Sequence, residues 1–313
     1  MTGGESLSKA IVLATIGIAV LTGGNAQGGM SQRGTPQGAR GQLAAQPTVT
    51  IGTKSVTEQH ILGQLYKQVL ESKGYRVVYK EDVGDTEAID AALGDGTIDF
   101  YPESIGVIVG DLAKKATPKT ADAAYGAAEK FEESRGNTVL AMTPFSYSDS
   151  FGILARTAKK LGVKTIADMK KVKSFSFGGL PECKTRTTCL LGLTKTYGLE
   201  QTRFVPLTSV SVYTALDQGK VTAGDAFSTD AQLSSSKYTM LTDTKHVFGF
   251  QNVVPVVSQK LSKDGGPKFA AAVDSVSAKL SLKAMIAMNK AVTIDKKSPE
   301  TVASAFLTAN KLK

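Results

Sequence analysis

Few side chains in this sequence have the chemistry of a catalytic group. The 313-residue chain contains two histidines, His60 and His246, and none of the patterns HExxH, GxSxG, GxGxxG or the phosphate-binding P-loop. The segment Ser228-Thr229-Asp230 offers a nucleophile and an acid, but no base accompanies them. A helix cap after the preceding strand is the simpler explanation of this segment. The sequence therefore predicts a protein that is not an enzyme and that needs no cofactor.

The two cysteines, Cys183 and Cys189, are separated by only five residues. A structural metal site needs more ligands than two cysteines, and neither histidine is nearby in the sequence. In an exported protein, such a pair favours a disulfide that pins a short loop. Free thiols remain the alternative.

The N-terminal segment is typical of an export signal. A short polar head precedes the 12-residue apolar run Ala10–Leu21, and small residues follow, up to a cleavage point near Gln27. The run is too short to span a bilayer core, which needs about 20 apolar residues. We interpret residues 1–26 as a signal peptide and the Gly- and Gln-rich residues 27–46 as a flexible tether. No cysteine for a lipid anchor lies near the cleavage point, so we expect a free periplasmic protein; a buried N-terminal helix is the alternative.

Composition and charge exclude several classes of protein. The chain is 42% hydrophobic and 21% charged, which is ordinary for a globular protein with one large domain or two lobes. The net charge is +9, but the basic residues occur as scattered pairs such as Lys170–Lys171. A nucleic-acid-binding protein more often carries a basic stripe with interleaved aromatic residues, so we expect no nucleic-acid partner.

Short β-type runs alternate with helical stretches along the rest of the chain, which favours α/β layers with a mostly parallel sheet. After residue 257 the pattern is almost purely helical. Predicted strands are Thr48–Gly52, Tyr75–Tyr79, Thr97–Tyr101, Thr138–Met142, Phe151–Ala155, Ser174–Gly178, Arg203–Pro206, Thr222–Phe227, Met240–Leu241 and Val253–Val257. Predicted helices are Val56–Lys73, Thr86–Leu93, Thr120–Ser134, Cys189–Tyr197, Val212–Gln218, Lys268–Leu280, Leu282–Lys290 and Pro299–Ala309.

Two short polar or Gly-containing segments, Ser146–Ser150 and His246–Asn252, divide this alternation into two blocks. If both are crossovers, residues 47–147 plus 249–313 form a discontinuous lobe I and residues 148–248 form lobe II. Two crossovers make a hinge, and a cleft between lobes is a preferred place to enclose a small ligand.

Five segments occur in this order along the chain: Ile51–Gln59, Ile98–Glu103, Thr165–Met169, Tyr213–Leu216 and Ala226–Asp230. Together they resemble the glycine betaine/choline/carnitine-binding proteins of osmoprotectant ABC importers. This resemblance implies a two-lobed type II periplasmic binding protein fold. It also implies a monomeric receptor that captures a small zwitterionic or quaternary-amine solute and delivers it to a permease driven by a separate ATPase. A sensory solute-binding module without transport is the rival interpretation.

The same resemblance suggests which residues contact the ligand. In the family, tyrosines surround the trimethylammonium group, because π faces hold a cation that cannot hydrogen-bond, and basic residues hold the carboxylate. The anion contacts carry over to Lys54 and Arg186 here, although Lys54 is also readable as a surface lysine and Arg186 as a partner of Glu182. The four positions of the tyrosine box are occupied by Ser104, Phe151, Phe227 and Gln251.

Only part of the aromatic box is therefore retained, since Phe keeps a π face but Ser104 and Gln251 do not. Both phenylalanines are also readable as ordinary core. Polar groups left dry and unpaired cost roughly 1–3 kcal/mol each. We therefore expect the ligand to be a larger zwitterion with additional polar groups or a different carboxylate. The alternative is that water occupies the positions beside Ser104 and Gln251 and that betaine binds weakly.

Overall fold

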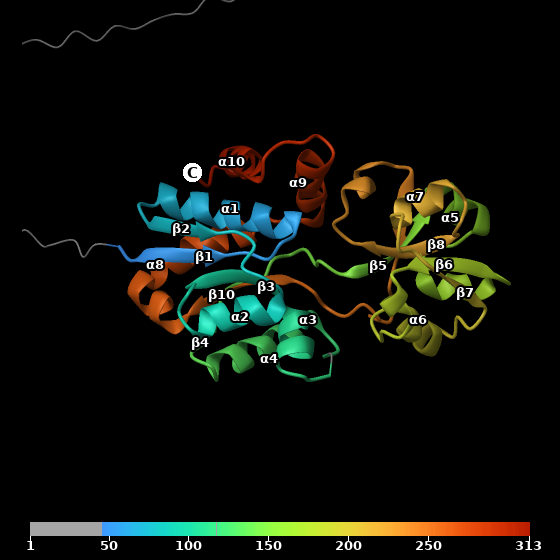
Figure 1. Cartoon of the computed structure of the whole chain (residues 1–313), viewed down its shortest axis with the longest axis horizontal. Coiled ribbons are helices and arrows are strands. Elements are labelled where there is room, and N and C mark those ends of the chain that lie inside the picture. Colours follow the sequence, from blue (N-terminus) through green and yellow to red (C-terminus); the bar gives the residue numbers. More distant parts are fainter. Residues whose placement is uncertain (1–45, 117) are drawn as a thin grey trace, which may run out of the picture. The chain divides into compact units, whose positions relative to one another are not determined.

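The computed structural model describes residues 46–116 and 118–313, whose strands form two five-stranded sheets (Figure 1). The predicted signal peptide and all but the last residue of the predicted tether lie outside the described residues. The strands are β1 Thr48–Gly52, β2 Arg76–Lys80, β3 Phe100–Ser104, β4 Asn137–Val139, β5 Asp149–Leu154, β6 Phe175–Gly179, β7 Thr202–Pro206, β8 Ala223–Phe227, β9 Tyr238–Leu241 and β10 Val253–Ser258.

Helices and short helical turns connect these strands. The α-helices are α1 Thr57–Ser72, α2 Thr86–Gly94, α3 Ile105–Val107, α4 Ala121–Glu133, α5 Ala155–Leu161, α6 Leu190–Tyr197, α7 Val212–Asp217, α8 Gln259–Ser277, α9 Leu282–Thr293 and α10 Pro299–Ala309. The remaining turns are the π-helix η1 Ile108–Leu112 and the 3₁₀ helices η2 Ile166–Lys171, η3 Pro181–Lys184 and η4 Ala231–Ser234.

The two sheets have the same topology. The first has the strand order β2-β1-β3-β10-β4, and the second has the order β7-β6-β8-β5-β9. In each sheet three parallel strands are followed by an antiparallel strand that comes directly after a crossover, namely β10 in the first sheet and β5 in the second. The predicted two-lobed α/β fold is thus confirmed.

The two segments that link the sheets are joined to each other. Ser146 and Asn252 form an isolated antiparallel bridge. The backbone N–H of Tyr147 donates to the carbonyl oxygen of Gln251 at 2.9 Å, and the backbone N–H of Gln251 donates to Ser146 Oγ at 3.1 Å. The predicted crossovers therefore run side by side as a paired hinge.

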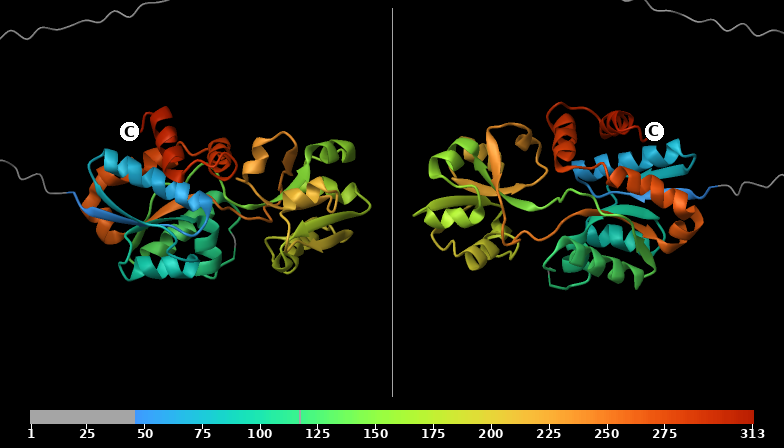
Figure 2. Two further views of the ribbon diagram at one scale, coloured as in Figure 1. Left: turned by 45° about the horizontal axis from the view of Figure 1, so that its top comes forward. Right: turned by 180° about the vertical axis from the view of Figure 1, so that it is seen from behind.

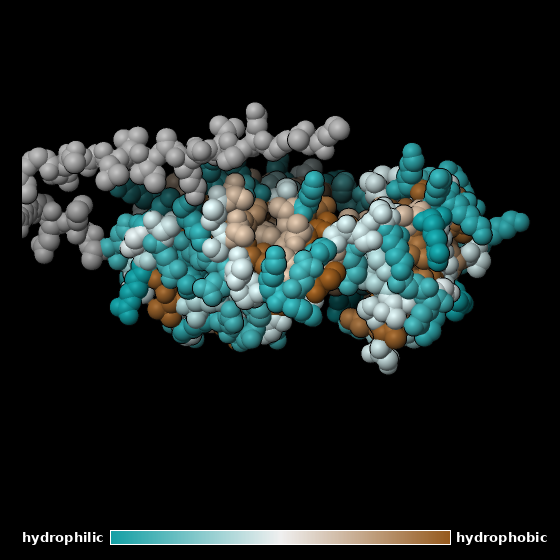
Figure 3. All heavy atoms as spheres, turned by 90° about the horizontal axis from the view of Figure 1, so that it is seen from above, coloured by the Kyte–Doolittle hydropathy of each residue, from teal (hydrophilic) through white to brown (hydrophobic). Residues whose placement is uncertain are grey.

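Each sheet buries side chains on both faces. One core of the first sheet lies beneath α1, α8, α9 and α10, and the other lies beneath α2 and α4 (Figures 1 and 2). In the second sheet, α6 and η2 cover the face that carries Phe151, whereas α7 covers the face that carries Leu154. In the half built on the first sheet, the surface around α9 and α10 in Figure 3 shows small apolar patches among hydrophilic residues. Within the described residues, no helix is long and apolar enough to cross a membrane.

Two predicted elements are displaced, and one helix of the structure has no predicted counterpart. The strand predicted at Thr97–Tyr101 is β3, which continues through Pro102 to Ser104. Pro102 is tolerated because β1 pairs with β3 only at Phe100, so the missing N–H lies beyond that pairing. Helix α8 starts at Gln259, nine residues before the predicted start, and the chain continues across Gly266, which takes a non-helical φ of 61°. Helix α5 was not predicted.

Candidate functional site

A cavity of about 300 Å³ lies where β6, β7 and β8 end. These three strands are parallel, so their carboxyl ends meet at one edge of the sheet, which is where open α/β sheets bind ligands. Leu180 and Phe227 line the cavity and are two of the six exposed large hydrophobic residues in the described part of the chain. The other lining residues are Asp149, Gly179, Glu182, Cys183, Arg186, Cys189, Leu207, Val210, Ser211, Val212, Tyr213, Asp225, Asp230 and Gln232.

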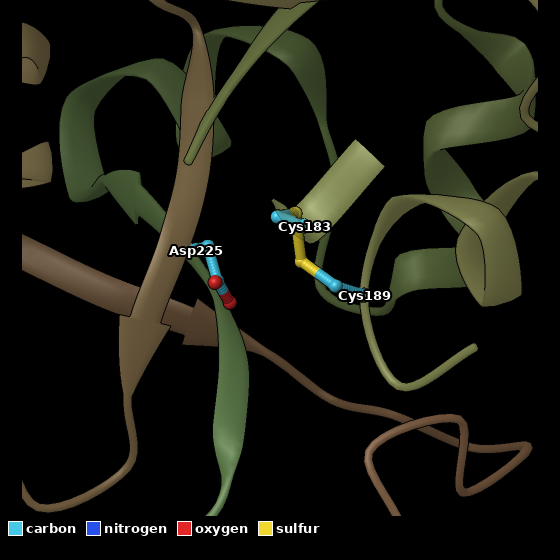
Figure 4. Close-up of side chains that lie close together, drawn as sticks. All are labelled: Cys183, Cys189 and Asp225. Carbon is cyan, nitrogen blue, oxygen red and sulfur yellow. A yellow bond between two sulfur atoms is a disulfide. The ribbon is translucent and has the colours of Figure 1, made fainter. Parts of the chain in front are cut away.

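One wall of the cavity is closed by a disulfide between Cys183 and Cys189, with an S–S distance of 2.03 Å, as predicted. Both cysteines are buried, and Asp225 on β8 lies beside them (Figure 4). The two sulfur atoms and the Asp225 carboxylate lie within 4.8 Å of one another. Because sulfur atoms joined in a disulfide are not thiolates, this cluster does not have the ligands of a metal site.

The loop closed by the disulfide presents Arg186 to the cavity. The Arg186 side chain is 61% exposed and its Nη2 lies 3.8 Å from Glu182 Oε1. This long, exposed contact leaves the guanidinium available to a ligand, because pairs of this kind contribute little stability. The sequence leaves open whether Arg186 contacts the ligand or pairs with Glu182. In the structure Arg186 lies close to Glu182 and is also exposed toward the cavity.

Two carboxylates face Arg186 across the cavity. Burial raises the pKa of Asp149, and the nearby charge of Arg186 opposes this rise. Burial also raises the pKa of Asp225; the Asp149 charge raises it further, and Arg186 opposes the rise. Asp225 Oδ1 is buried and has no hydrogen-bond partner among the described residues.

The aromatic part of the cavity comes from two chain segments. Phe227, at the end of β8, is 38% exposed and stacks on Tyr147 of the first crossover. Tyr213 donates its hydroxyl to Asp230 Oδ2 at 2.8 Å, and the same oxygen accepts the backbone N–H of Phe227 at 2.8 Å. Asp230 therefore fixes the backbone that carries the exposed phenyl ring.

Phe151, which the resemblance assigns to the aromatic box, lies outside the cavity lining. Its side chain is fully buried, with ring centroids 6.0 Å from Phe175 and 5.0 Å from Phe177. Phe151 and Asp149 point to the same face of β5, but Phe151 is two residues further into the sheet and is covered by the core. It belongs to the hydrophobic core, the alternative that the sequence had left open.

Of the remaining three predicted contacts, Lys54 and Ser104 lie at the first sheet and Gln251 lies in the second crossover. Lys54 pairs with Glu103, with Nζ 2.5 Å from Oε2, and donates to Thr86 Oγ1 at 2.8 Å. Ser104 is buried and its backbone N–H donates to Glu103 Oε1. Lys54, Glu103 and Ser104 therefore form a compact cluster in which the buried Glu103 carboxylate neutralises Lys54.

Gln251 packs against Gly106, where a Cβ would come within 2.4 Å of its Nε2. Gln251 Oε1 is buried and has no hydrogen-bond partner among the described residues. Of the six predicted ligand contacts, the cavity brings together Arg186 and Phe227, and the cavity lining does not include Lys54, Ser104 or Gln251.

Sequence reasoning missed the acidic residues of the cavity. Asp225 is the one charged residue within the apolar strand Ala223–Phe227, and Asp149 lies in the segment Ser146–Ser150, where β5 begins. A charge inside a buried strand is an unusual placement. That signal was available in the sequence, whereas the closeness of Asp149 to Asp225 depends on the strand order.

Similar proteins agree with this architecture. The chain is 30% identical over 285 residues to a glycine-betaine-binding protein of Pseudomonas aeruginosa, which covers 86% of this chain and 90% of the relative. It is 27% identical over 280 residues to the glycine betaine-binding protein YehZ of Escherichia coli, covering 85% and 91% of the two chains. A crystal structure described as a glycine betaine/carnitine/choline ABC transporter has the same fold, with a TM-score of 0.78 at 22% identity, covering 84% of this chain and 99% of the other.

The family match covers both sheets. Residues 47–309 match the family described as the substrate-binding domain of the ABC-type glycine betaine transport system. This range includes every strand described above and ends at the last residue of α10. The chain therefore belongs to the family of substrate-binding domains of ABC-type glycine betaine transport systems.

Proposed function

We propose that this chain is a non-catalytic, monomeric periplasmic receptor that captures a small solute with a cationic nitrogen and delivers it to a permease powered by a separate ATPase. Substrate-binding proteins of this family serve ABC importers by binding a small solute. The observation that carries the proposal is the cavity at the carboxyl ends of β6, β7 and β8, which combines an exposed aromatic ring with charged groups of both signs. Residues 1–26 would direct export.

The paired crossovers suggest how the receptor works. We infer that residues 47–147 plus 249–313 act as one lobe and residues 148–248 as the other, and that the lobes close on the solute about the Ser146–Asn252 bridge. On closure, Lys54, Ser104 and Gln251 would supply the wall opposite Arg186 and Phe227. The unpartnered Oε1 of Gln251 is a reason to expect a ligand with a hydrogen-bond donor.

A thermal-shift screen tests the proposal directly. Ligands that bind the folded state raise the melting temperature in a concentration-dependent way. The purified protein should respond to at least one solute among betaines, choline, carnitine and other zwitterions or amines. No shift with any of them would contradict the assignment of a cationic or zwitterionic solute and would leave only the fold.

A second candidate within the same fold is a receptor for a more polar carboxylate-bearing solute. Arg186 favours it, because a guanidinium can hold a carboxylate through two parallel hydrogen bonds. Organic acids without an amino group therefore belong in the screen. A response confined to those acids would select this candidate.

A further inference from the structure

The cavity contains more negative than positive side chains. Asp149, Asp225, Asp230 and Glu182 line it, and Arg186 is the one basic residue of its lining. On the first sheet, Lys54 is paired with the buried Glu103 and adds no free positive charge. A ligand that brings a positive charge into this cavity is therefore favoured by the surrounding side chains.

Two of the four acids are less suited to receive a ligand. Asp230 accepts hydrogen bonds from the Tyr213 hydroxyl and from the backbone of Phe227. Glu182 is close to Arg186 and about half of its side chain is exposed. Asp149 and Asp225 are the acids left to receive a ligand.

Asp149 and Asp225 lie together on one face of the sheet. In the antiparallel pairing of β5 with β8, Asp149 is opposite Phe227 and Asp225 is opposite Phe151. The two acids are thus diagonal neighbours, at a spacing of roughly 7–8 Å between backbones. Asp225 Oδ1 lacks a partner in the described part of the chain, although it is buried. A buried acceptor of this kind costs free energy until a donor reaches it.

We propose that Asp149 and Asp225 receive the cationic end of the solute, and that this end carries N–H donors, as a protonated amine or a guanidinium does. This inference rests on the proposed function and narrows its ligand class. A quaternary nitrogen has no N–H, so it would cover the carboxylates without satisfying them. It needs several aromatic faces instead, and the cavity lining supplies Phe227 and Tyr213, the second of which is hydrogen-bonded to Asp230.

The charges around the pair also predict a pH dependence. Burial and the charge of Asp149 raise the pKa of Asp225. The charges of Asp230 and Glu182 raise this pKa further, and the charge of Arg186 lowers it. Burial likewise raises the pKa of Asp149. Binding of an N–H cation favours the deprotonated pair, so affinity should increase as the pH rises and protons should be released on binding.

The experiment compares two matched series by titration calorimetry, ethanolamine to choline and glycine to glycine betaine, each with stepwise N-methylation, together with guanidinoacetate. The unmethylated members should bind at least tenfold more tightly than the quaternary members, and affinity should be higher at pH 8 than at pH 6. The guanidinoacetate titration distinguishes a guanidinium from an amine. Asp225→Asn should remove the preference for unmethylated over quaternary ligands, and Asp149→Asn should weaken this preference. Asp122→Asn, which removes an exposed charge on α4, is the matched control and should leave it unchanged.

Each outcome is informative. Tight binding of the quaternary members, unaffected by Asp225→Asn, would overturn the inference and leave the proposed function intact. Affinity that falls as the pH rises would also overturn it, because a protonated Asp225 would then be donating to an anionic group. Absence of binding by every compound would contradict the proposed function itself. Circular dichroism of each variant establishes that it is folded before its affinity is compared.

Discussion

The ring of Phe227 stacks on the ring of Tyr147, with centroids 5.1 Å apart and planes 11° apart. Phe227 lines the cavity at the end of β8, whereas Tyr147 belongs to the first crossover and its backbone is bonded to Gln251 of the second. One aromatic contact thus connects the cavity with both linking segments. A solute that packs on Phe227 therefore acts on a ring that is held by the hinge.

The first prediction separates the roles of two phenylalanines. Phe227→Ala should weaken binding of the best solute from the screen roughly twofold to thirtyfold, because a cation–aromatic contact contributes about 0.5–2 kcal/mol. Phe151→Ala should instead lower the free energy of unfolding by roughly 3–5 kcal/mol, since it empties a fully buried site. Calorimetric titration measures the first effect and denaturant unfolding the second. If Phe151→Ala changed affinity more than Phe227→Ala, Phe151 would contact the ligand as the resemblance implies.

The second prediction concerns the pair Lys54–Glu103. Lys54→Met should destabilise the protein by roughly 3 kcal/mol, because it leaves the buried Glu103 carboxylate without its cation. Glu103→Gln in the same chain should restore much of that loss, and denaturant unfolding of the four members of this double-mutant cycle measures the coupling. The double variant then reports the role of Lys54 in binding without the stability effect. Unchanged affinity in the double variant would show that Lys54 supports the fold and does not contact the ligand.

The sequence predicts most elements correctly, because in them the hydrophobic periodicity agrees with the residues that start and end helices. Helix α10 has the predicted bounds, with Ser298 as its cap and Pro299 at its start. The predicted strand Thr97–Tyr101 stops before Pro102, whereas β3 continues through it to Ser104. What makes proline acceptable there is the short pairing with β1, a tertiary feature. Phe151 and Phe227 show the same limit in the site. Both are phenylalanines on one face of the second sheet, and the depth that separates them comes from how the core is packed over β5.

The third prediction tests the place of Arg186. Arg186→Ala should lower the affinity for solutes with a carboxylate by more than tenfold, because the guanidinium can bond both carboxylate oxygens. The affinity for amines without a carboxylate should change much less. Arg186→Lys keeps the charge but not the fork of donors and should restore only part of the affinity. Equal losses for both ligand types would indicate that Arg186 acts through the overall charge of the cavity.

The fourth prediction concerns the disulfide that closes the Arg186 loop. Replacing both cysteines by serine should lower the free energy of unfolding by about 2 kcal/mol, the chain-entropy value for so short a loop. Carboxylate-bearing solutes should also bind more weakly, because the loop that presents Arg186 is no longer held against the sheet. The matched control is Arg186→Ala in the serine background. If the loop acts through Arg186, the two changes should be less than additive in affinity.

The fifth prediction is that the acids of the cavity make the empty protein less stable as the pH rises. The pKa of Asp225 and that of Asp149 are raised above the ordinary value for Asp of about 3.9. The folded state therefore binds protons more tightly than the unfolded state. The stability from this pair is fully present below about pH 4 and is lost as the pH rises through the raised values. Asp225→Asn should flatten this decline and raise the melting temperature near pH 8, while Asp122→Asn should follow the wild-type profile. Melting curves from pH 5 to pH 8 measure both, and an Asp225→Asn variant that melts below the wild type across this range would show that the Asp225 carboxylate stabilises the empty cavity.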